Sequence, residues 1–228
     1  MYEEKIIPPK KAMPQAQDGT LRKFALRVPE VIYQCSGIIV FGKRIKSLVF
    51  STDLSIIKNV NADAIIAVYP FTPQPIITQA LLLAADIPVF AGVGGGLTKG
   101  QRVVNLAMFA EMQGATGVVL NAPTANAVVQ HVAETIDIPV VVTVARADTD
   151  FEARLQAGAN IFNVSAAAET PAIVRSIRER YPDVPIIATG GPTDESILET
   201  IQAGANAITW TPPSNGEIFR DIMAAYRD

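Results

Sequence analysis

The chain has 228 residues, of which 49% are hydrophobic and 18% are charged, and its formal net charge is −3. No apolar run approaches 18 residues, so the sequence predicts no membrane-spanning helix and instead a large buried core. The near-neutral charge gives no general attraction to nucleic acid or anionic lipid. A single cysteine, Cys35, excludes an intrachain disulfide, and a single histidine, His131, argues against a histidine-based metal site. We therefore expect a cytoplasmic globular protein that holds no metal.

Residues 1–36 are predicted to form an N-terminal arm that precedes a single domain over residues 37–228. No apolar segment typical of a secretory signal occurs in the first 30 residues. The arm is rich in Lys, Pro and Gln, and we expect it to pack against the domain or against a partner subunit of a homo-oligomer. Two apolar runs around the turn Phe41-Gly42-Lys43 then predict a β-hairpin that leads into the first strand of the domain.

An internal repeat indicates the fold. Three strand-like segments begin with Asp, an aliphatic residue and Pro, at Asp86, Asp137 and Asp183. Proline is tolerated at the first position of a strand, where its missing N–H group costs little. These phrases therefore predict the starts of three related strands.

A second phrase, Gly-Ala, lies between the proline phrases and predicts where a helix ends and the chain returns to a strand. It occurs at Gly114, Gly158 and Gly204, each predicted to adopt the left-handed conformation that ends a helix. The apolar, β-branched runs that follow are typical of parallel strands buried on both faces. Eight strands are predicted in all, at residues 47–52, 63–69, 87–92, 116–121, 138–144, 161–165, 185–189 and 207–211. Helical patterns separate them, for example at residues 102–112, 125–136 and 173–180.

Regular alternation of strand and helix over residues 47–228 leaves roughly 23 residues for each of eight units, which short loops fill. This pattern predicts an α/β fold, a near-minimal (β/α)8 TIM barrel. Such barrels place their chemistry at the carboxyl ends of the strands. Functional residues are therefore expected in the loops that lead from each strand into the next helix.

Five candidate catalytic residues lie at these predicted strand ends: Asp53, Tyr69, Asn121, Arg146 and Asp148. Asp53 or Asp148 could act as a general base, Tyr69 as a general acid and Asn121 as a polar ligand. Arg146 suits the recognition of a carboxylate or phosphate. Asp53 also fits a helix N-cap, Tyr69 a ring that closes the barrel mouth, and Arg146 a salt bridge with Asp148, so both interpretations stay open.

The turn Thr189-Gly190-Gly191 is the first candidate anion site, because it precedes a helix whose backbone N–H groups could hold a phosphate. Ser214 and Gly216, at the start of the last helix, could complete this site. The same turn also fits a plain connection between strand and helix that needs glycine. A phosphate site and a merely structural turn are thus both open.

A second candidate anion site is the run Gly94, Gly95 and Gly96, followed by the cation Lys99. Backbone amides supported by a nearby positive charge can bind an anion. The competing interpretation is a flexible glycine loop without a ligand.

The stretch from Tyr181 to Thr193, continuing to the Gly-Ala phrase at Gly204, resembles 2-keto-3-deoxy-6-phosphogluconate aldolase. More widely, residues 47–228 resemble the phosphate-binding, aldolase-type TIM barrels, specifically over 155–206 and generally over 47–155. The resemblance implies a barrel enzyme that binds a small phosphorylated metabolite. The whole chain also resembles small bacterial barrels that carry only a general hydrolase label, which implies no mechanism.

The chain departs from the aldolase pattern at the position of its Schiff-base lysine. Asn163 stands there, and an amide cannot form an imine. No lysine follows Lys99, which excludes class I aldolase chemistry from the second half of the barrel. Pro212 and Pro213 also lack the N–H groups that a phosphate would need.

These features predict a metal-independent isomerase, epimerase or lyase that acts on a small phosphorylated or carboxylated metabolite through carboxylate and tyrosine chemistry. An FMN-dependent oxidoreductase is a second hypothesis, because the hairpin and the Gly190-Gly191 turn are similar to features of that group. A third hypothesis is a hydrolase of unknown substrate, and a fourth is a non-catalytic ligand-binding or scaffold barrel.

Overall fold

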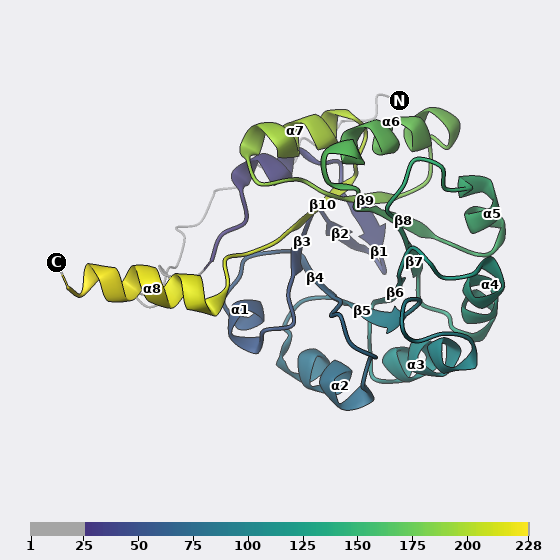
Figure 1. Ribbon diagram of the computed structural model, residues 1–228, viewed down its shortest axis with the longest axis horizontal. Coiled ribbons are helices and arrows are strands. Elements are labelled where there is room, and N and C mark those ends of the chain that lie inside the picture. The colour runs from purple at the N-terminus through teal and green to yellow at the C-terminus, as the bar shows by residue number, and fades with distance from the viewer. Residues whose placement is uncertain (1–25, 228) are drawn as a thin grey trace, which may run out of the picture.

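The computed structural model describes residues 26–227, in which eight parallel strands close into a barrel with helices around it (Figure 1). The strands follow one another around the ring in the order β10-β3-β4-β5-β6-β7-β8-β9. They are β3 (Ser47–Phe50), β4 (Ala64–Ala67), β5 (Val89–Gly94), β6 (Gly117–Leu120), β7 (Val140–Val144), β8 (Ile161–Val164), β9 (Ile186–Thr189) and β10 (Ala207–Trp210). Each overlaps one of the eight predicted strands, and the predicted fold class is confirmed.

Eight α-helices lie between or after these strands in the described part of the chain. They are α1 (Leu54–Lys58), α2 (Pro75–Ala84), α3 (Gln101–Met112), α4 (Asn126–Thr135), α5 (Phe151–Gln156), α6 (Thr170–Arg180), α7 (Asp194–Gln202) and α8 (Asn215–Ala225). Two short 3-10 helices, η2 (Glu30–Gln34) and η3 (Ala167–Glu169), complete the set. Within residues 26–227, no helix combines the length and apolar character needed to cross a membrane.

The Gly-Ala phrase ends helices in the way its sequence predicts. Gly114, Gly158 and Gly204 have φ values of +97°, +99° and +113°, which a residue with a side chain rarely adopts. The residue after this phrase then joins neighbouring strands at the amino end of the barrel. Asn160 Oδ1 accepts from the Val140 amide at 2.8 Å, and Asn206 Oδ1 from the Ile186 amide at 2.9 Å.

The predicted hairpin consists of β1 (Ile38–Val40) and β2 (Lys43–Ile45), which pair antiparallel. Ile38, Val40 and Ile45 are buried and pack against the apolar residues that point into the barrel. Because the hairpin directly precedes β3, it closes the amino end of the barrel.

Residues 26–36 cover the outside of the barrel between α7 and α1. Leu26 forms a parallel bridge with Val60, just after α1, and η2 packs on α7. Val28, Ile32 and Cys35 are buried in the main core between the barrel and its helices. This part of the predicted arm therefore belongs to the folded domain. The rest of the arm, residues 1–25, lies outside the described residues.

Helix α8 packs on the barrel only at its start, where half-buried Ile218 contacts the main core. It projects away from the ring on the side of α1 (Figure 1) and contributes no buried residue. Its start is attached to the barrel, because the Asn215 side chain donates hydrogen bonds to Asp53 and Ser55 at the beginning of α1.

Candidate functional site

The last layer of side chains inside the barrel, at its carboxyl end, is polar on five of the eight strands. Side chains two residues apart on a strand point to the same side, so this layer follows the buried interior residues of each strand. On β3, β4 and β5 it holds Phe50, Val68 and Gly92. On the remaining strands it consists of amide and hydroxyl residues, namely Asn121, Thr143, Asn163, Thr189 and Thr209.

Two of these polar side chains have a buried oxygen without a hydrogen-bond partner. Asn163 and Thr209 are 8% and 6% exposed, and neither Asn163 Oδ1 nor Thr209 Oγ1 is bonded within the described residues. The Asn163 amide nitrogen donates to Thr143 Oγ1 at 3.3 Å. Barrel interiors are usually filled by branched apolar residues, and an unpaired buried polar atom is unfavourable. These unpaired polar atoms make the layer a candidate contact surface for a polar ligand.

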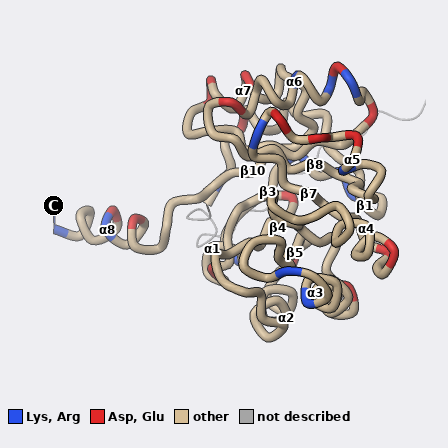
Figure 2. Tube along the Cα trace, turned by 45° about the vertical axis from the view of Figure 1, so that its right-hand side comes forward, with Lys and Arg blue, Asp and Glu red and all other residues tan. Residues whose placement is uncertain are grey.

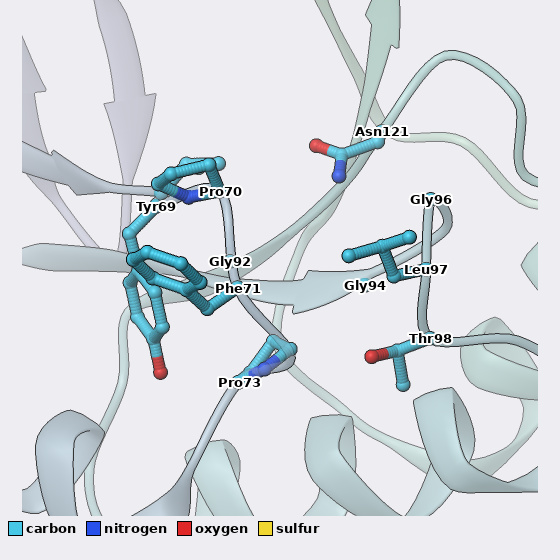
Figure 3. A pocket seen from close by; sticks show the side chains of 11 residues that line it. Tyr69, Pro70, Phe71, Pro73, Gly92, Gly94, Gly96, Leu97, Thr98 and Asn121 are labelled. Carbon is cyan, nitrogen blue, oxygen red and sulfur yellow. The ribbon is translucent and has the colours of Figure 1, made fainter.

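A pocket of about 180 Å³ lies next to this layer, above the ends of β4, β5 and β6 (Figure 3). Its apolar wall comes from the loop after β4, with Tyr69, Phe71 and Pro73. The Asn121 side chain points into the pocket from the opposite side, and no hydrogen bond to its amide occupies it within residues 26–227. The pocket thus combines an apolar wall with an amide that can bind a ligand.

The glycine run after β5 forms the second wall of the pocket as a packed turn. Gly95 has φ +101°, and a Cβ atom there would lie 1.8 Å from Thr124 Oγ1. The Gly95 amide donates to the Thr98 carbonyl at 2.9 Å. Thr98 is 4% exposed, and its hydroxyl oxygen faces the pocket without a partner in the described part of the chain (Figure 3). Lys99 is exposed beside this turn.

Arg154 on α5 holds the loop that follows Asn121. Its guanidinium donates to the Ala122 carbonyl and to Asn126 Oδ1, both at 2.8 Å, and also to the Thr124 carbonyl. In turn, Thr124 Oγ1 donates to the Asn121 carbonyl at 2.7 Å. Arg154 therefore fixes the loop that follows Asn121.

Asp53 lies at the end of β3 as an N-cap of α1. Its Oδ1 accepts from the Ser55 amide at 2.8 Å and from the Ile56 amide at 3.3 Å, and its Oδ2 from Asn215. The hydrogen bond from the Ser55 hydroxyl lowers the pKa of Asp53, so the group is ionised at neutral pH. The N-cap interpretation of Asp53 is thus confirmed, and an additional acid–base role stays a prediction.

Tyr69 contributes its ring to the pocket, while its hydroxyl group accepts a hydrogen bond from the Gln74 amide at 2.8 Å. The hydroxyl points away from Asn121 and Thr98 (Figure 3). In this arrangement the tyrosine shapes the wall and faces its hydroxyl toward the start of α2. A role as general acid stays a prediction that would require the side chain to turn.

Arg146 and Asp148 form an exposed pair in the loop after β7. Two hydrogen bonds of 2.9 and 2.8 Å join the guanidinium to the carboxylate, and the side chains are 78% and 69% exposed. The hydrogen bond from Arg146 lowers the pKa of Asp148. The expected salt bridge between the two residues is therefore present. Neither residue belongs to the polar layer inside the barrel.

The turn after β9 is closely packed, and its role as an anion site stays a prediction. Gly190 is buried where a Cβ atom would meet Ile197 and Ile208. The first turn of α7 carries Asp194, and the Ser196 amide already donates to the side chain of Thr193. A negative charge at this position opposes a second anion. Gly191 approaches Ser196 so closely that a Cβ atom would lie 2.6 Å from its hydroxyl, so packing explains both glycines.

Ser214 and Gly216 begin the projecting helix α8. The Ser214 hydroxyl and amide both bond to Glu217 in a capping box. These residues lie beside α1, as the hydrogen bonds of Asn215 show. The structure therefore shows Ser214 satisfied by its own helix.

Five residues at the site were not among the predicted functional residues: Thr98, Thr143, Arg154, Asn163 and Thr209. Three of them could have been found from the sequence, because they interrupt the apolar pattern of the strands β7, β8 and β10. Thr143, Asn163 and Thr209 are polar residues on apolar, buried strands, which is a marked departure from the expected pattern. In the sequence, Asn163 attracts attention only because it stands at the position of the Schiff-base lysine in the aldolase pattern. Its own ability to bind a ligand was not predicted.

The sequence matches no family model and no curated protein. Among solved structures, the fold is similar to 2,3-dimethylmalate lyase, a member of the PEP mutase/isocitrate lyase superfamily, with TM-score 0.62 and 12% identity over 91% of this chain and 85% of that one. It is also similar to phosphoenolpyruvate phosphomutase from Streptomyces platensis subsp. rosaceus, with TM-score 0.59 and 15% identity over 86% and 83% of the two chains. A third similar structure is phosphonopyruvate hydrolase in complex with oxalate and Mg²⁺, with TM-score 0.59 and 13% identity over 81% of this chain and 80% of that one.

At these identities the likeness shows the fold alone, a TIM barrel. It gives no support for the particular resemblance to 2-keto-3-deoxy-6-phosphogluconate aldolase. The Mg²⁺ of the hydrolase complex has no matching donor set in the described part of this chain. Residues 26–227 bring no group of three His, Cys, Asp or Glu side chains together. Val68, Gly92 and Asn121 occupy the strand ends around the pocket.

Proposed function

We propose that the protein is a small-molecule enzyme with lyase or isomerase chemistry, acting on a small carboxylate at the carboxyl end of the barrel. The observation that carries this proposal is the pair of buried, unpaired oxygens on Asn163 and Thr209, which belong to the same terminal layer of the barrel as Asn121, a residue that lines the pocket. Because these atoms are desolvated in the barrel, a ligand that bonds to them gains the interactions they lack.

The similar structures support the proposed substrate class. Their names specify 2,3-dimethylmalate, phosphoenolpyruvate and phosphonopyruvate, which are all small carboxylates, and their activities include a lyase, a mutase and a hydrolase. The carboxyl-end mouth is also where barrels of this fold place their reactions.

Neutral groups dominate the proposed site, and this determines how it would hold a carboxylate. The Asn121 amide and the Thr98 and Thr209 hydroxyls can donate hydrogen bonds to carboxylate oxygens. The Asn163 amide already donates to Thr143, so its Oδ1 is left as an acceptor. A substrate that carries a hydroxyl group beside its carboxylate would satisfy both: its carboxylate would accept hydrogen bonds from the donors, and its hydroxyl would donate one to Asn163 Oδ1.

Binding of hydroxylated and plain dicarboxylates by the full-length protein tests the proposal. We expect malate to bind more tightly than succinate by calorimetry, and a ligand at 100 times its Kd to stabilise the protein by about 2.7 kcal/mol. The Asn163→Ala variant should weaken malate binding about tenfold, since it removes one buried hydrogen bond.

Asn105→Ala is the matched control, because Asn105 lies on the outside of α3 and bonds only to Gln101 in the described structure. It should bind malate as the unchanged protein does. Reaction of a bound carboxylate would be followed by NMR, as cleavage or isomerisation. Absence of binding across a panel of small carboxylates, or equal binding by Asn163→Ala, would contradict the proposed function.

A further inference from the structure

We propose that the pocket beside Asn121 takes a 2-hydroxy carboxylate whose carbon chain ends in a small apolar group, and that Phe71 and Leu97 contact this group. The inference rests on the proposed function, because it takes the carboxylate and its hydroxyl group to be bound by the polar layer. It adds the chemistry of the other end of the ligand. The pocket reaches this layer at Val68, Gly92 and Asn121, so one ligand can touch both.

Two exposed apolar side chains lie on opposite walls of the pocket. Phe71, in the loop after β4, is 71% exposed, and Leu97, in the turn after β5, is 83% exposed. Leu97 points across the pocket toward the loop that carries Phe71 (Figure 3). Neither residue belongs to the apolar cores of the described structure. Apolar side chains that line a pocket outside the core form a surface for an apolar part of a ligand.

The loops that carry these two residues are held by contacts of their own. Prolines on both sides of Phe71 restrict its loop, and the Tyr69 hydroxyl group bonds to the backbone at the end of the same loop. In the turn of Leu97, the Gly95 amide donates to the Thr98 carbonyl at 2.9 Å. Loops that are already ordered lose little conformational entropy when a ligand binds. The apolar contact surface is therefore formed before the ligand arrives.

The distribution of charge around the pocket favours an apolar group over a phosphate. None of the described residues that line the pocket is charged. Residues 64–85, which form β4, the loop after it and α2, contain no charged side chain (Figure 2). Lys99, the next cation along the chain, is exposed and does not line the pocket. A phosphate that was desolvated against this wall would lack the cations that usually hold it.

The polar end of the ligand and the size of its apolar group follow from the rest of the pocket. Thr98 Oγ1, which is buried and unpaired within residues 26–227, and the Asn121 amide both face the pocket (Figure 3). The volume of about 180 Å³ is small beside the roughly 300–1,000 Å³ of pockets for drug-sized ligands. The apolar group is therefore no larger than a branched alkyl group or a single ring.

Three 2-hydroxy carboxylates that differ only in the group on their third carbon test the inference with the full-length protein. They are lactate, which carries hydrogen there, 3-phenyllactate, which carries a phenyl ring, and 3-phosphoglycerate, which carries a phosphate. We expect calorimetry to show that 3-phenyllactate binds more tightly than lactate by about tenfold or more, because each buried methylene-sized group contributes about fourfold. In contrast, 3-phosphoglycerate should bind no more tightly than lactate. Equal binding of lactate and 3-phenyllactate, or tightest binding of 3-phosphoglycerate, would overturn the inference.

Matched variants locate the apolar contact. Phe71→Ala should weaken the binding of 3-phenyllactate about tenfold and Leu97→Ala about fourfold, while lactate binding stays unchanged. Phe41→Ala and Leu83→Ala are the controls, because Phe41 at the hairpin tip and Leu83 on α2 are 69% and 81% exposed and do not line the pocket. Both controls should bind 3-phenyllactate as the unchanged protein does. Unchanged binding by Phe71→Ala and Leu97→Ala would overturn the inference.

The same measurements separate this inference from the proposed function. Binding of malate without binding of 3-phenyllactate would overturn the inference alone and leave the carboxylate site in place. Binding of 3-phenyllactate that is weakened by Phe71→Ala but unaffected by Asn163→Ala would support the apolar contact and contradict the proposed function.

Discussion

At the scale of single residues, two buried threonines distinguish a structural hydroxyl from a functional one. Thr200, 2% exposed, donates to the Ser196 carbonyl at 3.0 Å in α7, so its hydroxyl stabilises the fold. Thr209, 6% exposed, has no partner within residues 26–227. Burial is nearly the same in both cases, and only the hydrogen-bond partner differs. An unpaired hydroxyl lowers stability in the absence of a ligand, which is the pattern expected of a binding residue.

Replacement of each threonine by valine, which has nearly the same shape, should therefore give opposite results. We expect Thr209→Val to raise the free energy of unfolding of the ligand-free protein by about 1 kcal/mol and to weaken carboxylate binding. Thr200→Val should lower the free energy of unfolding by about 1 kcal/mol and leave binding unchanged. Urea unfolding and calorimetry measure the two effects. Equal destabilisation by both changes would show that Thr209 is bonded in the free protein.

At the scale of elements, the hairpin and the Gly-Ala phrase show what a local pattern can predict. The left-handed conformation of Gly158 follows from its place between a helix and a strand, because no other residue type adopts it as readily. The hairpin is likewise predicted by a glycine turn between apolar runs. Its role in closing the barrel could not be predicted, since an isolated hairpin carries no signal for the surface on which it packs.

Adjacent isoleucines on β1 test this role. Ile38 is 4% exposed against the barrel interior, and Ile39 is 64% exposed on the other face of the hairpin. Ile38→Ala should lower the free energy of unfolding by about 2–5 kcal/mol, the cost of a cavity in a packed core. Ile39→Ala should change it by less than about 0.5 kcal/mol. Chemical denaturation of both variants gives the comparison, and similar values would mean that the hairpin does not plug the barrel.

At the scale of the whole molecule, hydrogen bonds between distant parts of the chain hold the N-terminal segment and the start of α8 against the barrel. Asn206 bonds to Ile186, to Arg178 and to Ser36, so it joins the last repeat to the segment before the hairpin. On the carboxyl side, Asp53 and Asn215 join the first strand to the start of α8. These contacts decide where the N-terminal segment and the last helix lie.

The charge of Asp53 makes one of these contacts dependent on pH. Because the pKa of Asp53 is lower in the folded protein, its stabilising effect is complete above the unfolded pKa, about 3.9, and is lost as the pH falls through the folded value. Asp53→Asn keeps an N-cap, so it should lower Tm slightly at pH 7, and the difference should shrink as the pH falls below the unfolded pKa. Thermal unfolding across this range measures the difference, and a constant difference would contradict the role of the charge. Loss of carboxylate turnover in the same variant would support the acid–base prediction for Asp53.

The sequence by itself determined the barrel, because each strand, helix end and turn is encoded locally and the phrases repeat along the chain. It also placed the candidate residues at the carboxyl ends of strands. Only the tertiary structure decided which of them face the pocket, since the side chains of Asp53, Tyr69 and Arg146 are engaged in hydrogen bonds while Asn121 points into the pocket. The outward course of α8 was also decided there. Its amphipathic pattern is that of any barrel helix, and only long-range contacts at its start and on the barrel surface direct it away.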